Sequence, residues 1–334
     1  MKRFSKTLLI LISVLLLNSC EKALDSGDPS TSPVAVFEDL WNAIDRNYAL
    51  FSVKGIDWDS VYQQNKISVN DNLSSTELFK KCGDMLDVLK DGHVSLITPE
   101  RIYAYENFFR AFPTNFNLPN IEKTYLNGQY KKLGPIIYKV VNEVGYIYYR
   151  SFRENISDAE LNLFIDEMAA TKGLIVDVRS NSGGSLTNVS KLFSRFINKK
   201  TLVKFELQKK GAGQDEFFDE EPHYISPAGV YYGKPIVVLT NRSCFSACND
   251  FVLYMSYLPN VRLVGDQTGG GGAIPANYLL VNGWKLQYSS SMTLSPDHLP
   301  VENGIPPDFF ASITPVQETQ GRDPILEKAY DLLK

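Results

Sequence analysis

Histidine and cysteine are scarce in this sequence, with three and four copies among 334 residues. Cys244 and Cys248 lie close together, but no histidine is near them, so the spacing is not that of a typical zinc site. We expect both cysteines to be packing residues, and a disulfide between them is possible but not needed. The sequence therefore predicts no metal site.

An excess of positive charge is also absent. The chain carries 34 lysines and arginines against 38 aspartates and glutamates, which gives a net charge of −4 at pH 7. The basic residues form no stripe that would follow a phosphate backbone. Nucleic acid is therefore not expected as a partner.

A hydrophobic run near the N-terminus covers residues 7–17, which is too short to span a membrane comfortably. Basic residues precede it and Cys20 follows it, an arrangement that resembles a bacterial lipoprotein signal. We expect residues 1–19 to be a signal peptide, Cys20 to carry a lipid, and residues 20–32 to form a flexible tether. The lipid would hold the protein in the cell envelope, at the outer membrane or another periplasmic face. An ordinary signal peptide with a chance cysteine is the alternative.

Residues 33–96 are predicted to form a small helical bundle. Ser32 followed by Pro33 is typical of a helix start, and a second helix is expected near Asp57. Ser74 and Glu77 form a capping box before a third helix. Apolar residues then recur on one face of that helix: Leu78, Cys82, Met85, Leu86 and Leu89.

Residues 97–135 form a connecting segment with few clear periodic patterns. Its aromatic residues are Tyr103, Tyr105, Phe108, Phe109 and Phe112. Ordinary packing beneath a long loop is the favoured role for them, and a substrate groove or a subunit contact are the alternatives.

Strands and helices alternate in residues 136–334, which predicts a layered α/β core. Strands are expected at 136–141, 144–149, 174–178, 236–240 and 261–264, and a hairpin over 278–289. Helices are expected after the Ser157 capping box with a stop at Gly173, after Ser185, over 246–258 and over 324–333.

Ser246 stands where a buried strand turns into a helix. Such a position can present a nucleophilic hydroxyl beside the free N–H groups of the new helix, although a serine there is more often only a cap. Another strand leads into a loop that contains Gly183 and Gly184, and Asp177 and Arg179 are expected to hold that loop by hydrogen bonds.

Four separated motifs together resemble one family of serine peptidases, which includes the C-terminal processing proteases and the tricorn-type proteases. They are Asp91-Gly-His93, Asp177 to Gly184, Ser246-Ala247 with the glycine loop after it, and Glu302 to Asp308. The resemblance implies a crotonase-like serine peptidase domain over residues 136–334. The interval between His93 and the strand at Val144 is too short for a PDZ domain, which many relatives carry there.

The tricorn branch is the better match because the loop after Thr268 contains no lysine, the base of the other branch. The resemblance implies Ser246 as nucleophile, His93 as general base and Glu302 as a helper. It also implies an oxyanion hole from Ala247 N–H with Gly183 or Gly184, and it implies no cofactor.

One position departs from the tricorn pattern. A second serine adjoins the histidine there, whereas this chain has Gly92. Either Ser95 substitutes for it, or another polar group orients His93. We expect an acyl-enzyme peptidase for peptides or unfolded protein. The alternatives are a non-catalytic binding protein of the same fold, for a peptide or an apolar ligand, and a small-molecule esterase or amidase. The sequence leaves the oligomeric state open.

Overall fold

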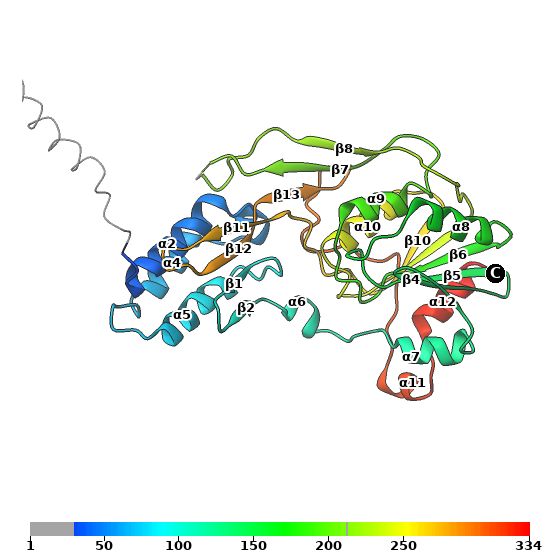
Figure 1. Ribbon diagram of the computed structural model, residues 1–334, viewed down its shortest axis with the longest axis horizontal. Coiled ribbons are helices and arrows are strands. Elements are labelled where there is room, and N and C mark those ends of the chain that lie inside the picture. Colours follow the sequence, from blue (N-terminus) through cyan, green and yellow to red (C-terminus); the bar gives the residue numbers. More distant parts are fainter. Residues whose placement is uncertain (1–29, 212) are drawn as a thin grey trace, which may run out of the picture.

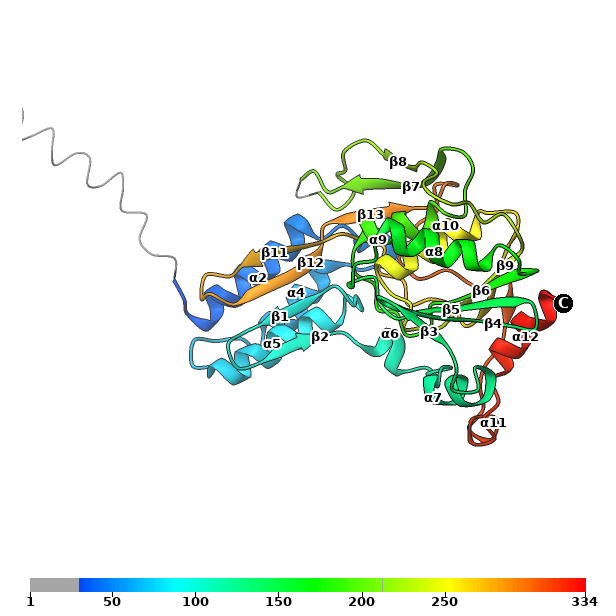
Figure 2. The same ribbon diagram turned by 45° about the vertical axis from the view of Figure 1, so that its right-hand side comes forward.

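The computed structural model describes residues 30–211 and 213–334. Figures 1 and 2 show the N-terminal helices at one end of the molecule and a layered sheet with helices at the other end. The predicted signal peptide, Cys20 and nearly all of the predicted tether lie outside the described residues. In the part that the structure does describe, no helix is long and apolar enough to cross a membrane.

The N-terminal module consists of four helices: α2 (Pro33–Asn47), α3 (Phe51–Lys54), α4 (Trp58–Lys66) and α5 (Ser75–Asp87). The predicted helix starts are confirmed. The Ser32 hydroxyl accepts a hydrogen bond from Ala35 N–H, and Ser74 and Glu77 form the reciprocal capping box. The apolar face predicted for α5 is buried.

The N-terminal module is not an independent bundle. A four-stranded antiparallel sheet joins it to the C-terminal half, in the order β11 (Pro275–Leu279), β12 (Lys285–Ser289), β1 (Ser95–Ile97) and β2 (Ile102–Ala104). The hairpin expected over 278–289 is therefore present, but its residues share one hydrophobic core with α2 and α5. The boundary expected at residue 96 does not reflect this shared core, because β1 is short and its partner strand β12 is distant in the sequence.

A seven-stranded sheet forms the main body. Its order is β14 (Phe309–Phe310), β10 (Val261–Gly265), β9 (Ile236–Thr240), β6 (Gly173–Asp177), β5 (Val144–Tyr149), β4 (Ile136–Val141) and β3 (Lys131–Leu133). The pairs from β14 to β5 are parallel, and the β5–β4 and β4–β3 pairs are antiparallel. The strands predicted from sequence are confirmed to within one residue at each end.

Helices cover both faces of this sheet. One face packs against α8 (Asp158–Met168), α9 (Leu186–Phe193) and α10 (Ala247–Ser256), and the other against α12 (Pro324–Leu332). Side chains of β6 alternate between the two cores, with Leu174 and Val176 on one face and Ile175 on the other. The predicted α/β class is confirmed.

Two details of the expected pattern change. Gly173 does not stop α8, which ends at Met168; it begins β6, where an added Cβ would approach Leu333 Cδ2 to 2.6 Å. A further sheet was not expected: β13 (Ser291–Leu294), β7 (Thr201–Gln208) and β8 (Glu221–Ile225), the last two of which run along the top of Figure 1.

The connecting segment contains α6 (Asn107–Arg110), α7 (Leu118–Asn120) and a π-helix at Ile121–Tyr125, all of them short. A five-residue helix, α11 (Pro315–Thr319), precedes α12.

Candidate active site

Ser246 occupies the turn between β9 and α10 in a conformation that is unusual for a residue with a side chain. Its φ is 58° and its ψ is −128°, a combination that typically costs about 1–3 kcal/mol. Two backbone hydrogen bonds hold it there, from Ser246 N–H to Gly270 O at 2.9 Å and from Asp250 N–H to Ser246 O at 3.1 Å. The hydroxyl therefore stands at the N-terminus of α10 without capping that helix.

His93 comes from the turn after α5, and its ring reaches Ser246. The Asp91 carboxylate fixes this turn by accepting a 2.7 Å hydrogen bond from His93 N–H. The distance from His93 Nε2 to Ser246 Oγ is 3.1 Å, although the two residues are 153 positions apart. Burial lowers the pKa of His93; the Asp91 charge opposes this effect and Lys54 adds to it. The His93 ring is thus within hydrogen-bond reach of the serine hydroxyl, and its lowered pKa favours the neutral imidazole that a general base requires.

The glycine loop lies directly against the serine. An ideal Cβ on Gly183 would be 2.9 Å from both Ser246 Cβ and Ala247 N, and the glycine has a φ of +93°. Gly183 N–H already donates to Asn181 Oδ1 at 2.9 Å. Ala247 N–H opens α10, where the helix supplies it with no acceptor. Ala247 and Gly184 are therefore the better candidates for the two oxyanion donors, with Gly183 providing the close approach.

Asp177 and Arg179 anchor the start of this loop, as predicted. Arg179 donates to both carboxylate oxygens of Asp177, at 2.9 and 2.7 Å, and also to Asp323 at the N-terminus of α12. All three side chains are buried. The guanidinium therefore ties the glycine loop to the C-terminal helix and does not face the serine.

Glu302 is buried beside the site and pairs with a lysine that the sequence analysis missed. Lys54 Nζ lies 3.3 Å from Glu302 Oε1 and also donates to Lys90 O at 3.2 Å. Burial, followed by the charge of Asp91, raises the pKa of Glu302 to about 8. Among the described residues no hydrogen bond joins Glu302 to His93, so Glu302 is linked to the site through its contact with Lys54.

Among the described residues, Ser95 makes no hydrogen bond to the His93 ring. Its hydroxyl donates to Gln287 Oε1 at 3.3 Å, across the β1–β12 pair. His93 Nδ1 is buried and has no hydrogen-bond partner within residues 30–211 and 213–334. The structure therefore does not support the hypothesis that Ser95 replaces the second serine of the tricorn pattern.

Two phenylalanines occupy the space that a side chain at position 92 would need. The rings of Phe108 and Phe245 are stacked with centroids 4.3 Å apart, and the His93 ring lies 4.7 Å from Phe245. Phe108 therefore has a packing role, as expected for the aromatic run. It packs against Phe245, next to the candidate active site. Neither Lys54, on a one-turn helix, nor Phe108 has a local sequence pattern that would have revealed this position.

Cys244 and Cys248 are buried free thiols, and both point to Val178 O. They support the turn before Ser246 as packing residues, as predicted. In the described part of the chain, no three His, Cys, Asp or Glu side chains are arranged to hold a metal ion.

Comparison with known proteins identifies a peptidase family for this chain. The profile of peptidase family S41 matches residues 143–310, half of the chain, and that of the tricorn protease C1 domain matches residues 29–87. The Probable CtpA-like serine protease of Staphylococcus aureus is 30% identical over 179 residues, which cover 51% of this chain. The match covers 34% of that relative, so the chain spans about a third of its length.

Solved structures show the same fold. A structure from Parabacteroides merdae, described as that of a candidate peptidase, is 38% identical with a TM-score of 0.88, and the match covers 91% of this chain and 97% of that one. Mature CPAF shares the fold at 13% identity with a TM-score of 0.68, over 91% of this chain and 96% of its own. The chain belongs to peptidase family S41.

Proposed function

We propose that this protein is a serine endopeptidase that cleaves peptides or unfolded protein segments through an acyl-enzyme. The observation that carries the proposal is the 3.1 Å contact between His93 Nε2 and Ser246 Oγ at the N-terminus of α10. Family membership supports the peptidase class. The residue roles and the substrate are our inference.

Acylation begins when His93 Nε2 takes the hydroxyl proton of Ser246 while Oγ attacks the carbonyl carbon of the scissile bond. Charge then develops on the carbonyl oxygen, next to Ala247 N–H and the glycine loop. Removing one such donor typically costs about 3 kcal/mol in the transition state. The protonated histidine next gives its proton to the leaving amine, and the C–N bond breaks.

Deacylation repeats the same steps with water. His93 removes a proton from the water, the hydroxide attacks the acyl-enzyme ester, and Ser246 leaves with the proton returned by the histidine. The lowered pKa of His93 favours this cycle because the ring must be neutral at the start of each half-reaction.

Labelling with a fluorophosphonate probe tests the proposal on the purified full-length protein. We expect labelling of the wild type, none in Ser246→Ala and much slower labelling in His93→Ala. Ser243→Ala, a partly buried serine three positions before the nucleophile, is the matched control and should label normally. An unlabelled but folded wild type would contradict the proposal, and turnover of short esters with no peptide cleavage would replace peptidase by esterase.

We also propose that Cys20 carries a lipid that anchors the enzyme in the cell envelope. The support is the sequence alone, with its basic start, its hydrophobic run over residues 7–17 and the cysteine that follows. Detergent phase partitioning of the wild type and Cys20→Ala tests this. A wild type that stays in the aqueous phase would overturn the anchor without affecting the peptidase.

A further inference from the structure

A pocket of about 320 Å³ opens beside the Ser246–His93 pair. Its walls combine aromatic rings with cations; the main contributors are Lys54, Lys90, Phe108, Phe112, Arg242 and Phe245. Gly92 and Glu302 also line it. Gly92 and Phe245 directly precede His93 and Ser246 in the sequence, so the pocket lies next to this pair. This chemistry fits an organic anion.

The cations of this pocket keep donors available for a ligand. Lys54 Nζ has three N–H donors, of which Glu302 Oε1 and Lys90 O occupy two. Arg242 packs over the Phe112 ring at 4.1 Å, with its Nε 3.3 Å from Asp266 Oδ1. Its guanidinium donates no hydrogen bond to another described residue. These three cations, Lys54, Lys90 and Arg242, outnumber the two carboxylates that pair with them, Glu302 and Asp266, so the pocket carries an excess of positive charge.

The position of the pocket relates it to one half of the substrate. It is lined by Lys90 and Gly92 on the histidine turn, whereas Gly183 and Gly184 take no part in it. In acyl transfer the histidine gives its proton to the leaving amine, so the leaving-group half of the substrate lies on the histidine side. The pocket therefore faces residues that follow the scissile bond.

We propose that this pocket binds a carboxylate carried by the leaving-group half of the substrate. The proposal rests on the peptidase function above and deepens it. An acidic side chain shortly after the scissile bond and the terminal carboxylate of a short leaving peptide offer the same chemistry. Arg242 and Lys54 would bind the anion, while Phe108 and Phe245 exclude water around it.

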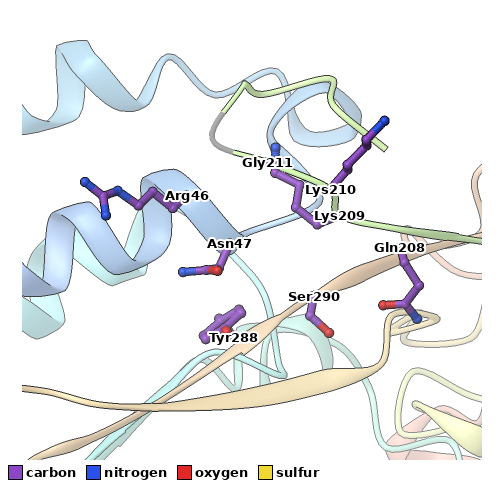
Figure 3. A pocket seen from close by; sticks show the side chains of 8 residues that line it. All are labelled: Arg46, Asn47, Gln208, Lys209, Lys210, Gly211, Tyr288 and Ser290. Atoms are coloured by element: carbon purple, nitrogen blue, oxygen red, sulfur yellow. The ribbon is translucent and has the colours of Figure 1, made fainter. Parts of the chain in front are cut away.

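A second pocket of the same size provides a control. It is also about 320 Å³ and includes Arg46, Lys209 and Lys210, together with Tyr288 and Ser290 (Figure 3). Ser289, which lies between the last two, points the other way and bonds to Asp91 at 2.7 Å. Since side chains alternate along a strand, this pocket opens on the far face from the active site. In Figure 3 the Arg46 and Lys210 side chains extend apart.

Three matched peptides test the proposal after a cleavage site has been mapped by mass spectrometry. Two are amidated and differ only by Glu or Gln at the first two positions after the scissile bond. The third has neutral residues and a free carboxylate two positions after that bond. For a carboxylate held by charge-assisted hydrogen bonds we expect kcat/KM to be at least about tenfold higher than for the neutral amidated peptide. The more favoured carboxylate peptide identifies the source.

Arg242→Gln should bring the ratio of kcat/KM between the carboxylate peptide and the neutral peptide close to one. Lys210→Gln in the control pocket should leave this ratio unchanged. Equal rates for all three peptides in an active wild type would overturn the carboxylate pocket and leave the peptidase intact. If no peptide is cleaved, binding of the same peptides to Ser246→Ala is measured by fluorescence anisotropy and decides whether the pocket holds a carboxylate. Tighter binding of a carboxylate peptide than of the neutral one supports the pocket, and equal binding overturns it.

Discussion

The ring of Phe108 fills the position where a side chain at Gly92 would project. An ideal Cβ on Gly92 would lie 2.5 Å from Phe108 Cε1 and 2.8 Å from Phe245 Cζ. A serine next to the histidine, as in the tricorn pattern, is therefore incompatible with these rings. The Phe245 ring also packs against the His93 ring, at a centroid distance of 4.7 Å and an interplanar angle of 54°.

Gly92→Ser should consequently impair the enzyme, even though it restores the tricorn pattern. Overpacking typically costs about 1–3 kcal/mol, and the displaced Phe245 ring contacts the base, so we expect kcat to fall by at least about tenfold. Adding Phe108→Ala should recover part of the loss. Steady-state kinetics of the single and double variants checks this, and an active single variant would contradict the steric account.

Ser95→Ala should keep kcat/KM within about twofold of wild type, because its hydroxyl bonds Gln287 and not His93. Ser289→Ala is the informative comparison. It removes the hydrogen bond to Asp91 Oδ2, and Asp91 holds the His93 turn. We expect a larger fall in kcat for Ser289→Ala, and a large effect of Ser95→Ala would restore the hypothesis that Ser95 belongs to the catalytic set.

The acid limb of the pH profile of kcat/KM should lie below pH 6.5, the ordinary pKa of histidine. Burial lowers the pKa of His93 in the free enzyme, so the neutral base persists at lower pH. Lys54 contributes to that lowering, and Lys54→Met should move the limb to higher pH. Lys66→Met, on the exposed end of α4, is the control. A limb that stays in place in Lys54→Met would argue against this electrostatic coupling.

Glu302 should make the folded state less stable as pH rises. The pKa of Glu302 is about 8 in the folded protein, whereas the ordinary value for an unburied glutamate is 4.5. The folded state therefore holds a proton that the unfolded state has lost, and the stabilisation present at acid pH disappears as pH rises through about 8. Thermal unfolding of Glu302→Gln should show a weaker fall with pH than wild type, with Glu100→Gln as an exposed control.

Arg179→Met should destabilise the protein by about 3–5 kcal/mol, because it leaves the buried carboxylate of Asp177 without its partner. Denaturant unfolding measures the change. Asp177→Asn in the same background removes the unpaired charge and should recover part of the stability. If Arg179→Met costs less than about 1 kcal/mol, the pair does not anchor the glycine loop.

Much of the architecture was predictable because it has local signals. The strands at 136–141 and 144–149 and the capping boxes at Ser74 and Ser157 lie where the patterns placed them. The resemblance also proposed Ser246 and His93 as partners, and the structure brings their reactive atoms together.

The remaining features depend on contacts that no local pattern encodes. Lys54 lies on a helix of four residues, and its pairing with Glu302 exists only after the chain ends are brought together. The β7–β8 pair was missed because β8 is mostly exposed and shows no clear alternation of apolar and polar residues. Phe108 belongs to a four-residue helix with no buried residue, which gives no periodic signal.

The sheet that joins β1 to β12 has a consequence for how the protein is made. Translation completes the His93 turn early, but the strand that braces it ends at Ser289 and the carboxylate of Glu302 follows later still. A growing or half-folded chain therefore presents a serine without a fixed base. The proposed hydrolytic activity would begin only when synthesis is nearly finished, which protects the chain itself and its neighbours until then.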